Sequence, residues 1–353
     1  MGGGLMQLVA YGAQDIYLTG NPQITFFKVV YRRHTNFAVE AIQQTYNGTV
    51  SSTSKVSVTV SRNGDLLSRV WLKANDGLTF QDIEYVECEI GGQVIDKQYG
   101  DWMALWCDLT HNTDQAKLLE GLAVTSKTHL PLQFWFCRNP GLALPLIALQ
   151  YHEVKLNIQF KGAIGDNFEV YCDYIFLDTD ERRRFAQVSH EYLIEQTQFS
   201  NVLSAGNAGS NEGAATNKQV ELRFNHPVKE LVWTITNGST HAVLKDALLQ
   251  LNGHDRFKRR EGVYFTQVQR YQHHSGSGDT FHGSGSTPAV YSFALKPEEH
   301  QPSGTCNFSR IDNAVLNVNF WHGSGGAHNL RVYAVNYNVL RVMSGMGGLA
   351  YSN

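Results

Sequence analysis

The chain has 353 residues, of which 42% are apolar and 17% are charged, and this length leaves room for two domains that each bury a core. The net charge of −3 argues against a nucleic-acid-binding protein, because phosphate contacts require an excess or a face of basic residues. Five scattered cysteines without a C-x-x-C pair exclude a disulfide framework and predict reduced thiols.

The start of the chain shows no export signal, and no apolar stretch approaches the length of a membrane span. Residues 1–15, MGGGLMQLVAYGAQD, lack the basic region of a secretory signal. The longest apolar run, at residues 142–149, falls far below the ~20 residues that a spanning helix needs. We therefore predict that the chain does not cross a bilayer.

Alternation of apolar and polar residues dominates the sequence and predicts half-buried strands. In KVSVTVS (55–61), three valines lie on one face and serine or threonine on the other. The strands predicted in the first half are residues 24–31, 38–46, 55–61, 66–73, 83–90, 130–137, 153–161 and 168–177. Those predicted in the second half are residues 218–224, 228–236, 243–251, 289–295, 314–321 and 329–340.

Helical segments are few and short in this pattern. Residues 98–109 and 259–270 are predicted as helices, about 160 positions apart, and residues 180–196 have room for a helical turn or two. Residues 201–218 are rich in Gly, Asn, Ala and Ser and indicate a linker or surface loop.

Short sequence motifs recur along the chain at a nearly constant spacing. LNIQF (156–160) returns as LNVNF (316–320), 160 positions later. Two further matches, at offsets of 162 and 161, are Val170-Tyr171 with Val332-Tyr333 and Gly92 with Gly253. The spacing is far longer than the 20–50 residues of solenoid repeats, so it indicates an internal duplication of a unit of roughly 160 residues.

Strands that are apolar on one face bury that face against a second sheet. About eight strands per half, each half with one short helix after its Gly turn, favour an all-β fold. We predict two consecutive eight-stranded jelly-roll sandwiches with short helices in the loops.

The sequence offers no constellation typical of an enzyme. It contains no phosphate loop, dinucleotide fingerprint, nucleophile elbow or H-E-x-x-H pattern. His273, His274 and His282 crowd one segment but lack the rigid placement of a metal site, and the carboxylates at residues 297–299 are interpreted as solvated loop charge. We predict no catalytic, cofactor-binding or metal-binding residues.

Three N-x-[ST] sequons stand at Asn47, Asn237 and Asn307. They are the candidate glycosylation sites, although the missing export signal gives no reason to expect the secretory route.

Six long segments closely resemble the major capsid proteins of nucleocytoplasmic large DNA viruses, in order and through nearly the whole chain. The first is GGLMQLVAYGAQDIYLTGNPQITFFKVVYRRHTNFA (3–38), and it is followed by residues 130–158, 180–199, 224–233, 291–312 and 330–353. The resemblance implies a double jelly roll. The expected layout is an N-terminal arm (1–23), a first jelly roll (24–199), a linker or loop (200–217), a second jelly roll (218–345) and a C-terminal tail (346–353).

The resemblance also implies a structural role without catalysis or cofactor. Three copies are expected to form a homotrimer of pseudo-hexagonal outline that tiles an icosahedral virus shell beside neighbouring capsomers. The arm is expected on the inner face, where minor capsid proteins bind, near an internal membrane that the chain does not span and without direct contact to nucleic acid. The protein is then expected in the virion, after synthesis and assembly in the host cytoplasm.

Three other interpretations remain open from the residues. The loops between strands look shorter than in many members of the family. A capsid paralogue with a specialised position in the shell is therefore a second interpretation. A jelly-roll glycan-binding module is an alternative, with Trp102, Trp106, Trp135 and Trp321 as candidate stacking platforms, although Trp within strands and short helices is more often core. A cupin-like enzyme is disfavoured by the missing histidine pattern.

Overall fold

The computed structural model describes residues 3–75, 78–112, 114–115, 128–162, 164, 167–200, 203–207, 216–236, 243–276, 288–321 and 327–352. The chain separates into two units, Met1–Asn36 and Phe37–Asn353.

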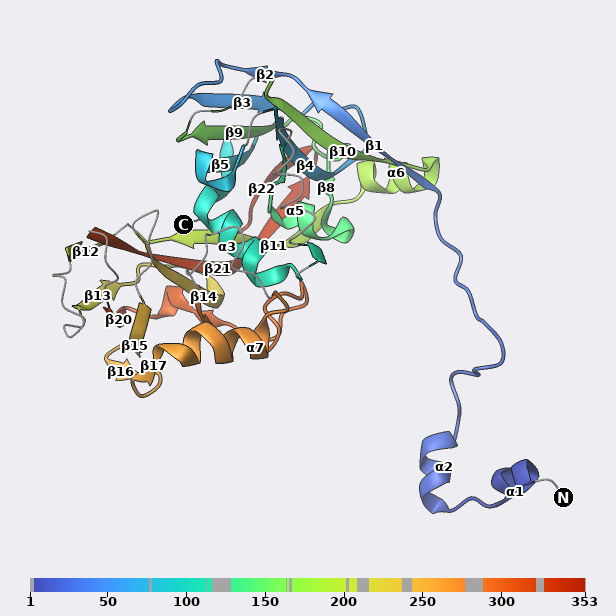
Figure 1. Ribbon diagram of the computed structural model, residues 1–353. Helices are drawn as coiled ribbons and strands as arrows, with labels where there is room; N and C mark the ends of the chain where they lie inside the picture. Colours follow the sequence, from blue (N-terminus) through green and yellow to red (C-terminus); the bar gives the residue numbers. More distant parts are fainter. Residues whose placement is uncertain are drawn as a thin grey trace. The chain divides into compact units, whose positions relative to one another are not determined.

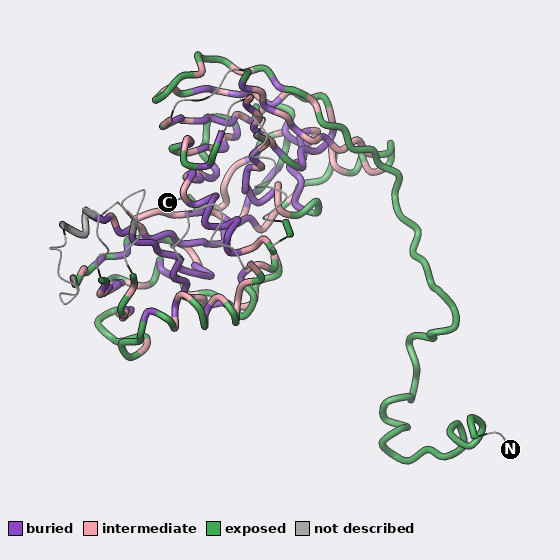
Figure 2. The backbone as a smooth tube through the Cα atoms, viewed as in Figure 1, coloured by how far each residue is buried: buried purple, intermediate pink, exposed green. Residues whose placement is uncertain are grey.

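The first unit contains two short helices, α1 (Gly3–Val9) and α2 (Ala13–Thr19), and its described residues are exposed throughout (Figure 2). The prediction of a strand at residues 24–31 was wrong, because this segment has no regular structure. Its apolar and β-branched residues favour a strand, but the segment pairs with no other strand within the described chain, and unpaired backbone groups do not make a sheet.

The second unit carries the strands (Figure 1). The first-half strands are β1 (Phe37–Gln44), β2 (Tyr46–Asn47), β3 (Lys55–Thr59), β4 (Leu66–Ala74), β5 (Ile83–Ile90), β6 (Gln93–Tyr99), β7 (Thr128–Pro131), β8 (Leu144–Pro145), β9 (Val154–Phe160) and β10 (Glu169–Leu177). The second-half strands are β11 (His190–Phe199), β12 (Leu203–Asn207), β13 (Thr216–Glu221), β14 (Pro227–Thr236), β15 (Val243–Leu251), β16 (His254–Asp255), β17 (Arg260–Glu261), β18 (Ala289–Ser292), β19 (Cys306–Asn307), β20 (Ala314–Trp321), β21 (Ala327–Met343) and β22 (Met346–Leu349).

The two halves share one sheet topology. The first half has sheets in the order β1-β10-β4-β7 and β2-β3-β9-β5-β6, and the second half has β11-β21-β14-β18 and β13-β20-β15-β16. β9 lies between β3 and β5 as β20 lies between β13 and β15, so the repeated words LNIQF and LNVNF are equivalent strands. Gly92 and Gly253 follow equivalent strands with φ of 87° and 78°, a left-handed conformation that favours glycine.

The all-β double jelly roll with short helices is therefore confirmed, and short extra strands such as β8 and β19 extend its sheets. Each sandwich buries its own core: the first from Val56 onward and the second from Val220 onward. Phe160 and Phe320 are fully buried, one in each core.

The predicted helices are present with small shifts. Residues 98–109 correspond to α3 (Gly100–Thr110), and residues 259–270 correspond to a π-helical turn, η3 (Tyr264–Val268), that continues into α7 (Gln269–His273). Further helical segments in the described part of the chain are η1 (Phe80–Asp82), α5 (Trp135–Arg138), η2 (Pro140–Leu142), α6 (Thr179–Gln187) and η4 (Phe308–Arg310).

The predicted strand at residues 130–137 was partly wrong, because β7 ends at Pro131 and α5 begins at Trp135. Proline lacks the N–H that would continue the ladder, and β7 is an edge strand of its sheet.

Residues 190–199 differ from the predicted helical turns, because α6 ends at Gln187 and β11 then pairs with β21 along its whole length. β11 connects the two halves: its backbone lies in the second-half sheet, whereas its Ile194 packs in the first core.

The expected linker and tail also contain strands that pair with the long strand β21. They are β12, within residues 200–217, and β22, within residues 346–353. Composition alone could not identify β12, because its pairing partner lies more than 100 residues away in the sequence, whereas β22 pairs with the end of β21 that directly precedes it.

We predict that Phe160→Ala and Phe320→Ala each lower the free energy of unfolding by roughly 3–5 kcal/mol, because each leaves a cavity in a closed core. Asn317→Ser is expected to cost no more than about 1 kcal/mol, since the Asn317 amide lies on the other face of its strand and donates to Gln250 at 3.3 Å. Urea denaturation of the variants measures both values. Small and equal losses at all three positions would show that the strand faces are assigned incorrectly.

Candidate functional site

The two sandwiches meet at α3, which is buried on both sides (Figure 1). Met103, Ala104 and Cys107 of this helix pack in the first core. The opposite face forms a separate apolar cluster, which we call the seam. Its buried members are Trp102, Leu105, Trp106 and Leu109 of α3 with Val232, Val290, Tyr333 and Val335 of the second jelly roll. Because α3 covers their outer side, β14, β18 and β21 have apolar neighbours on both faces.

Aromatic rings dominate the seam. The ring centroids of Trp102 lie 5.8 Å from Trp106 and 5.3 Å from Tyr333, and those of Tyr99 and Phe199 lie 4.7 Å apart. Tilted aromatic pairs at such distances stabilise beyond their buried area, by about 0.5–1.5 kcal/mol each. The seam is thus a third core that fixes one jelly roll on the other.

A buried charge cluster extends the seam. Lys229 of β14 is fully buried, and its Nζ lies 2.7 Å from Glu195 Oε1 and donates to the Pro297 carbonyl at 2.6 Å. Arg138 of α5 binds the other Glu195 oxygen at 2.8 Å, and its guanidinium lies 4.0 Å from the Trp106 ring centroid. Residues of both halves therefore share one carboxylate.

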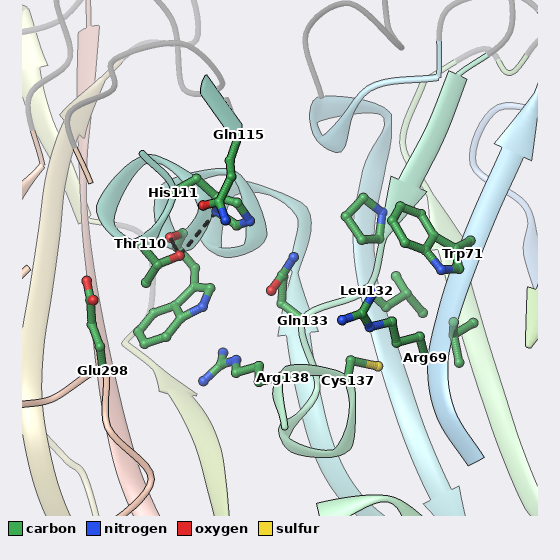
Figure 3. Close-up of a pocket in the computed structure, with 13 residues that line it drawn as sticks. Arg69, Trp71, Thr110, His111, Gln115, Leu132, Gln133, Cys137, Arg138 and Glu298 are labelled. Atoms are coloured by element: carbon green, nitrogen blue, oxygen red, sulfur yellow. Dashed lines mark hydrogen bonds between the residues drawn. The ribbon is translucent and has the colours of Figure 1, made fainter. Parts of the chain in front are cut away.

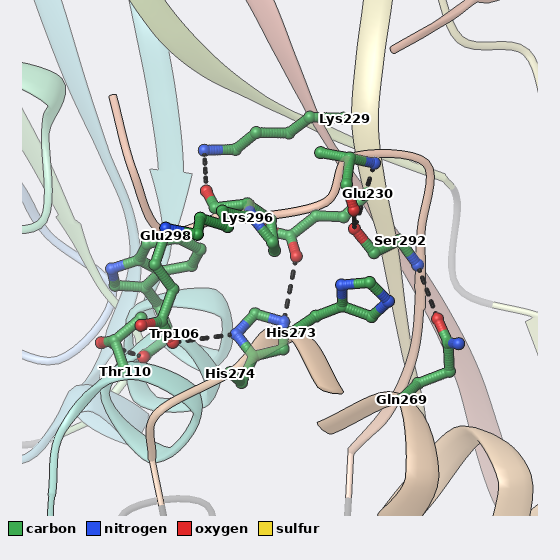
Figure 4. Close-up of polar contacts among 12 residues, drawn as sticks. Trp106, Thr110, Lys229, Glu230, Gln269, His273, His274, Ser292, Lys296 and Glu298 are labelled. Carbon is green, nitrogen blue, oxygen red and sulfur yellow. Dashed lines mark hydrogen bonds and ion pairs between the residues drawn. The ribbon is translucent and has the colours of Figure 1, made fainter. Parts of the chain in front are cut away.

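His274 forms the second part of this cluster (Figure 4). Its Nε2 lies 3.1 Å from Glu230 Oε2 and its Nδ1 lies 3.1 Å from Glu298 Oε1, with the imidazole fully buried. The neighbouring Ser275 donates its hydroxyl and its backbone N–H to Glu298. Gly276 donates its N–H to the Leu109 carbonyl at 2.7 Å, so this segment closes onto the end of α3.

The charges in this cluster are mutually stabilised. Burial alone disfavours an imidazolium, but the carboxylates of Glu230 and Glu298 outweigh it and raise the pKa of His274 to about 9. Burial likewise acts to raise the pKa of Glu230, yet the charges of His274 and Lys229 hold that pKa below its ordinary value. The basic side chains of Lys229, Arg138 and His274 thus lie against the carboxylates of Glu195, Glu230 and Glu298, and such mutual pairing is what lets charged groups be tolerated in a protein interior.

The described residues that line the hollow beside the seam form no catalytic arrangement. It is lined by residues that include Arg69, Trp71, Thr110, His111 and Cys137 (Figure 3). Thr110 donates its hydroxyl to a backbone carbonyl of its own helix, and burial lowers the pKa of His111 and raises that of the Cys137 thiol to about 12. These groups stay neutral and are not activated as nucleophiles.

The two described histidines of the cluster, His273 and His274, have separate environments. His273 contacts the Leu295 carbonyl, His274 lies in the charge cluster, and His282 lies outside the described residues. Within the described part of the chain, no group of three or more His, Cys, Asp or Glu is placed to hold a metal ion. Glu298 was interpreted as solvated loop charge, and this was wrong, because it is the partner of His274. No local pattern in the sequence distinguishes it from its exposed neighbour Glu299.

The remaining candidate residues are the sequon asparagines and the tryptophans. Asn47 and Asn307 are exposed, and Asn237 lies outside the described residues, so their glycosylation stays a prediction. Of the four tryptophans considered as stacking platforms, Trp102, Trp106 and Trp135 are buried, whereas Trp321 is 41% exposed. Among the described residues, no helix has the length and apolar character to cross a membrane.

Family models match nearly the whole chain. The model described as "Major capsid protein N-terminus" matches residues 25–178, and the model described as "Large eukaryotic DNA virus major capsid protein" matches residues 181–243 and 236–348. The boundary between the two matches falls in α6.

Two curated relatives are similar along their full length. The major capsid protein of Pyramimonas orientalis virus is 53% identical over 410 aligned positions, and that of Paramecium bursaria Chlorella virus 1 is 43% identical over 449, each alignment covering 100% of both chains. Since the present chain has 353 residues, both relatives contain insertions relative to it.

Solved structures share the fold. The quasi-atomic model of the PBCV-1 virus capsid superposes with a TM-score of 0.81 and 40% identity, covering 93% of this chain and 100% of that chain. The Faustovirus major capsid protein superposes with a TM-score of 0.73 at 11% identity, covering 95% of each chain, which shows a common fold at low sequence similarity.

The charge cluster predicts a pH dependence of stability. Because the pKa of His274 is raised from about 6.5 to about 9 on folding, the stabilisation by its imidazolium is complete below pH 6.5 and is lost as the pH rises through 9. The other basic side chains that face these carboxylates are Lys229 and Arg138, and buried Asp96, with a pKa of about 6, titrates below this window. We expect the unfolding temperature to fall between pH 7 and pH 9.5.

Substitution of His274 and of its neighbour His273 is expected to affect stability differently. His274→Gln is expected to lower the free energy of unfolding at pH 7 by roughly 3–5 kcal/mol, because Glu230 loses its cation, and to flatten the pH dependence. His273→Gln, one position away, is the matched control and should retain the wild-type profile. Thermal melts over the pH series measure both, and a His274→Gln profile as steep as that of the wild type would refute the assignment.

Proposed function

The chain belongs to the major capsid proteins of large eukaryotic DNA viruses, and we propose that it builds the virus shell as a homotrimeric capsomer. Members of this family are structural components of the virion rather than enzymes, and this chain is a structural protein of the same kind. The capsid model that it resembles is an assembly of such chains.

The observation that carries the homotrimer is the repeated topology of the two halves. One chain presents two similar lobes, held together by the seam, and three chains in a closed ring present six. Closed rotational symmetry is the usual outcome for an assembly of identical subunits. A ring of six similar lobes has the pseudo-hexagonal outline that lets capsomers tile the faces of an icosahedral shell.

We propose that the N-terminal arm (1–23) is the contact for minor capsid proteins on the inner face. Large apolar side chains are exposed along it, among them Leu5, Leu8, Tyr17 and Leu18, and contiguous exposed apolar surface is typical of an interaction site. The internal viral membrane then lies near the arm without being spanned, and nucleic acid makes no direct contact. Assembly is proposed to take place in the host cytoplasm.

We also retain the proposed division into jelly rolls at residues 24–199 and 218–345. It is supported by the two cores, since Ile194 still packs in the first and Val220 is the first member of the second, although Leu340 and Val342 near the end of β21 also pack in the first core. The tail (346–353) then adds β22 to the second-half sheet.

Sedimentation of the purified full-length chain tests the homotrimer. We expect one species at three times the 39.5 kDa chain mass that persists at micromolar concentration, since an interface of obligate size resists dissociation. Negative-stain images should show a six-lobed outline. A persistent monomer at this concentration would contradict the proposal.

A further inference from the structure

We propose that the outer face of the β1-β10-β4-β7 sheet binds the η3–α7 helix of a second copy of this chain. The contact repeats between two chains the packing of α3 on the β11-β21-β14-β18 sheet within one chain. The inference rests on the proposed homotrimer and names the surfaces that hold it together.

The η3–α7 helix is the counterpart of α3. Both helices follow the sheet hairpin of their own sandwich, and each is preceded or begun by a glycine, Gly100 and Gly262, at an offset of 162. A Cβ on Gly100 would collide with the Ile83 carbonyl, and one on Gly262 would collide with the Leu244 carbonyl. These carbonyls lie at the start of the equivalent strands β5 and β15. The two helices therefore begin at the same place in each jelly roll.

The inward faces of the helices correspond at the same offset. Met103 of α3 and Phe265 of η3, 162 positions apart, are both fully buried in the core of their own sandwich. The offset thus matches this inward position of the two helices, whereas Tyr264, the counterpart of the seam residue Trp102, packs against the second core.

The outward faces differ in what covers them and, at one position, in polarity, since the counterpart of the seam residue Leu105 is the exposed Gln267. In α3, Trp106 and Leu109 are buried in the seam. Their counterparts at the offset of 162 are Val268 and Tyr271, which are 38% and 90% exposed. Val268 and Tyr271 thus place apolar and aromatic side chains at positions whose counterparts in α3 contact the next lobe. No further lobe of this chain covers them.

The receiving sheets correspond in register. On the second-half sheet, Val232 pairs with Tyr333 on one side and with Val290 on the other, and all three lie in the seam under α3. On the first-half sheet, the same three strand positions are occupied by Trp71, paired with Tyr171 on one side and with Pro131 on the other.

The face formed by Trp71, Tyr171 and Pro131 has the composition of a protein interface. These three residues are partly exposed, and Trp71 also lines one wall of the hollow (Figure 3). Tyr171 donates its hydroxyl to Glu169 at 2.7 Å, so its polar group is satisfied within the sheet. Glu169 in turn pairs with Lys73 at 2.7 Å. An aromatic centre with a charged rim is typical of protein–protein contacts.

The proposed contact joins the second jelly roll of one chain to the first jelly roll of another, and this is why we assign the binding partner as a second copy of this chain. The helix belongs to the second jelly roll and the receiving face to the first, so the contact runs head to tail. Head-to-tail contacts close into rings when the rotation permits, and in the proposed homotrimer this contact alternates with the seam around the ring. Both partners are present in every copy, and the geometry is that of a contact that the chain already makes internally.

A negative charge introduced at the exposed Tyr271 tests the proposed interface. Tyr271→Asp in the full-length chain is expected to raise the trimer dissociation constant by roughly 30-fold or more, as for a central aromatic contact. Tyr151→Asp is the matched control, since Tyr151 is 76% exposed and lies outside this helix and this face, and its trimer should match the wild type. Both sites are exposed, so thermal melts of the two variants should agree. Analytical ultracentrifugation measures the dissociation constants.

Cross-linking gives a second, independent readout. A Trp71→Cys, Tyr271→Cys double variant treated with a short bismaleimide should yield covalent species of up to three chains. The two single variants supply the background from native thiols, and Trp71→Cys with Tyr151→Cys should not exceed it. If the wild type is trimeric but Tyr271→Asp and Tyr151→Asp associate equally and the double variant gives only background, the interface is refuted while the trimer stands. A monomeric wild type would refute both proposals.

Discussion

The packing of α3 against the outer side of the β11-β21-β14-β18 sheet is the constraint on which the rest of the molecule depends. A jelly roll normally leaves the outer faces of its sheets to solvent. Here Trp102, Trp106 and Leu109 cover one such face and join two closed sandwiches through a third apolar cluster. The buried charges of Lys229, Glu195 and Arg138 continue this contact with directional partners from both halves. Two lobes therefore hold a fixed relation, which a subunit of a regular shell requires.

The seam combines non-directional and directional forces. Apolar and aromatic burial supplies most of the attraction, whereas a buried ion pair adds little net stability and is costly only when one partner is removed. The charge cluster is therefore best understood as a device that admits one arrangement of the lobes. His274 is its most sensitive member, because its partners Glu230 and Glu298 come from different segments.

The sequence predicted the architecture well and the contacts between lobes poorly, for a physical reason. Period-two alternation located β5, β15 and β20 to the residue, since it records local burial on one face of a strand. β12 and residues 24–31 were misassigned, because pairing depends on a partner that is remote in the chain or missing from it. Glu298 was missed for a similar reason, as an acidic residue in a turn-rich stretch carries no local sign of a buried imidazole.

The duplication gives one principle for fold and assembly, because a contact made once inside the chain is proposed to recur between chains. A side-chain-resolution reconstruction of the purified capsomer tests this claim most directly. The account predicts three chains in a ring of six lobes, with Tyr271 of each chain packed over Trp71 of the next, in the place that Leu109 and Val232 occupy within a chain. A ring in which the η3–α7 helix faces solvent would contradict it.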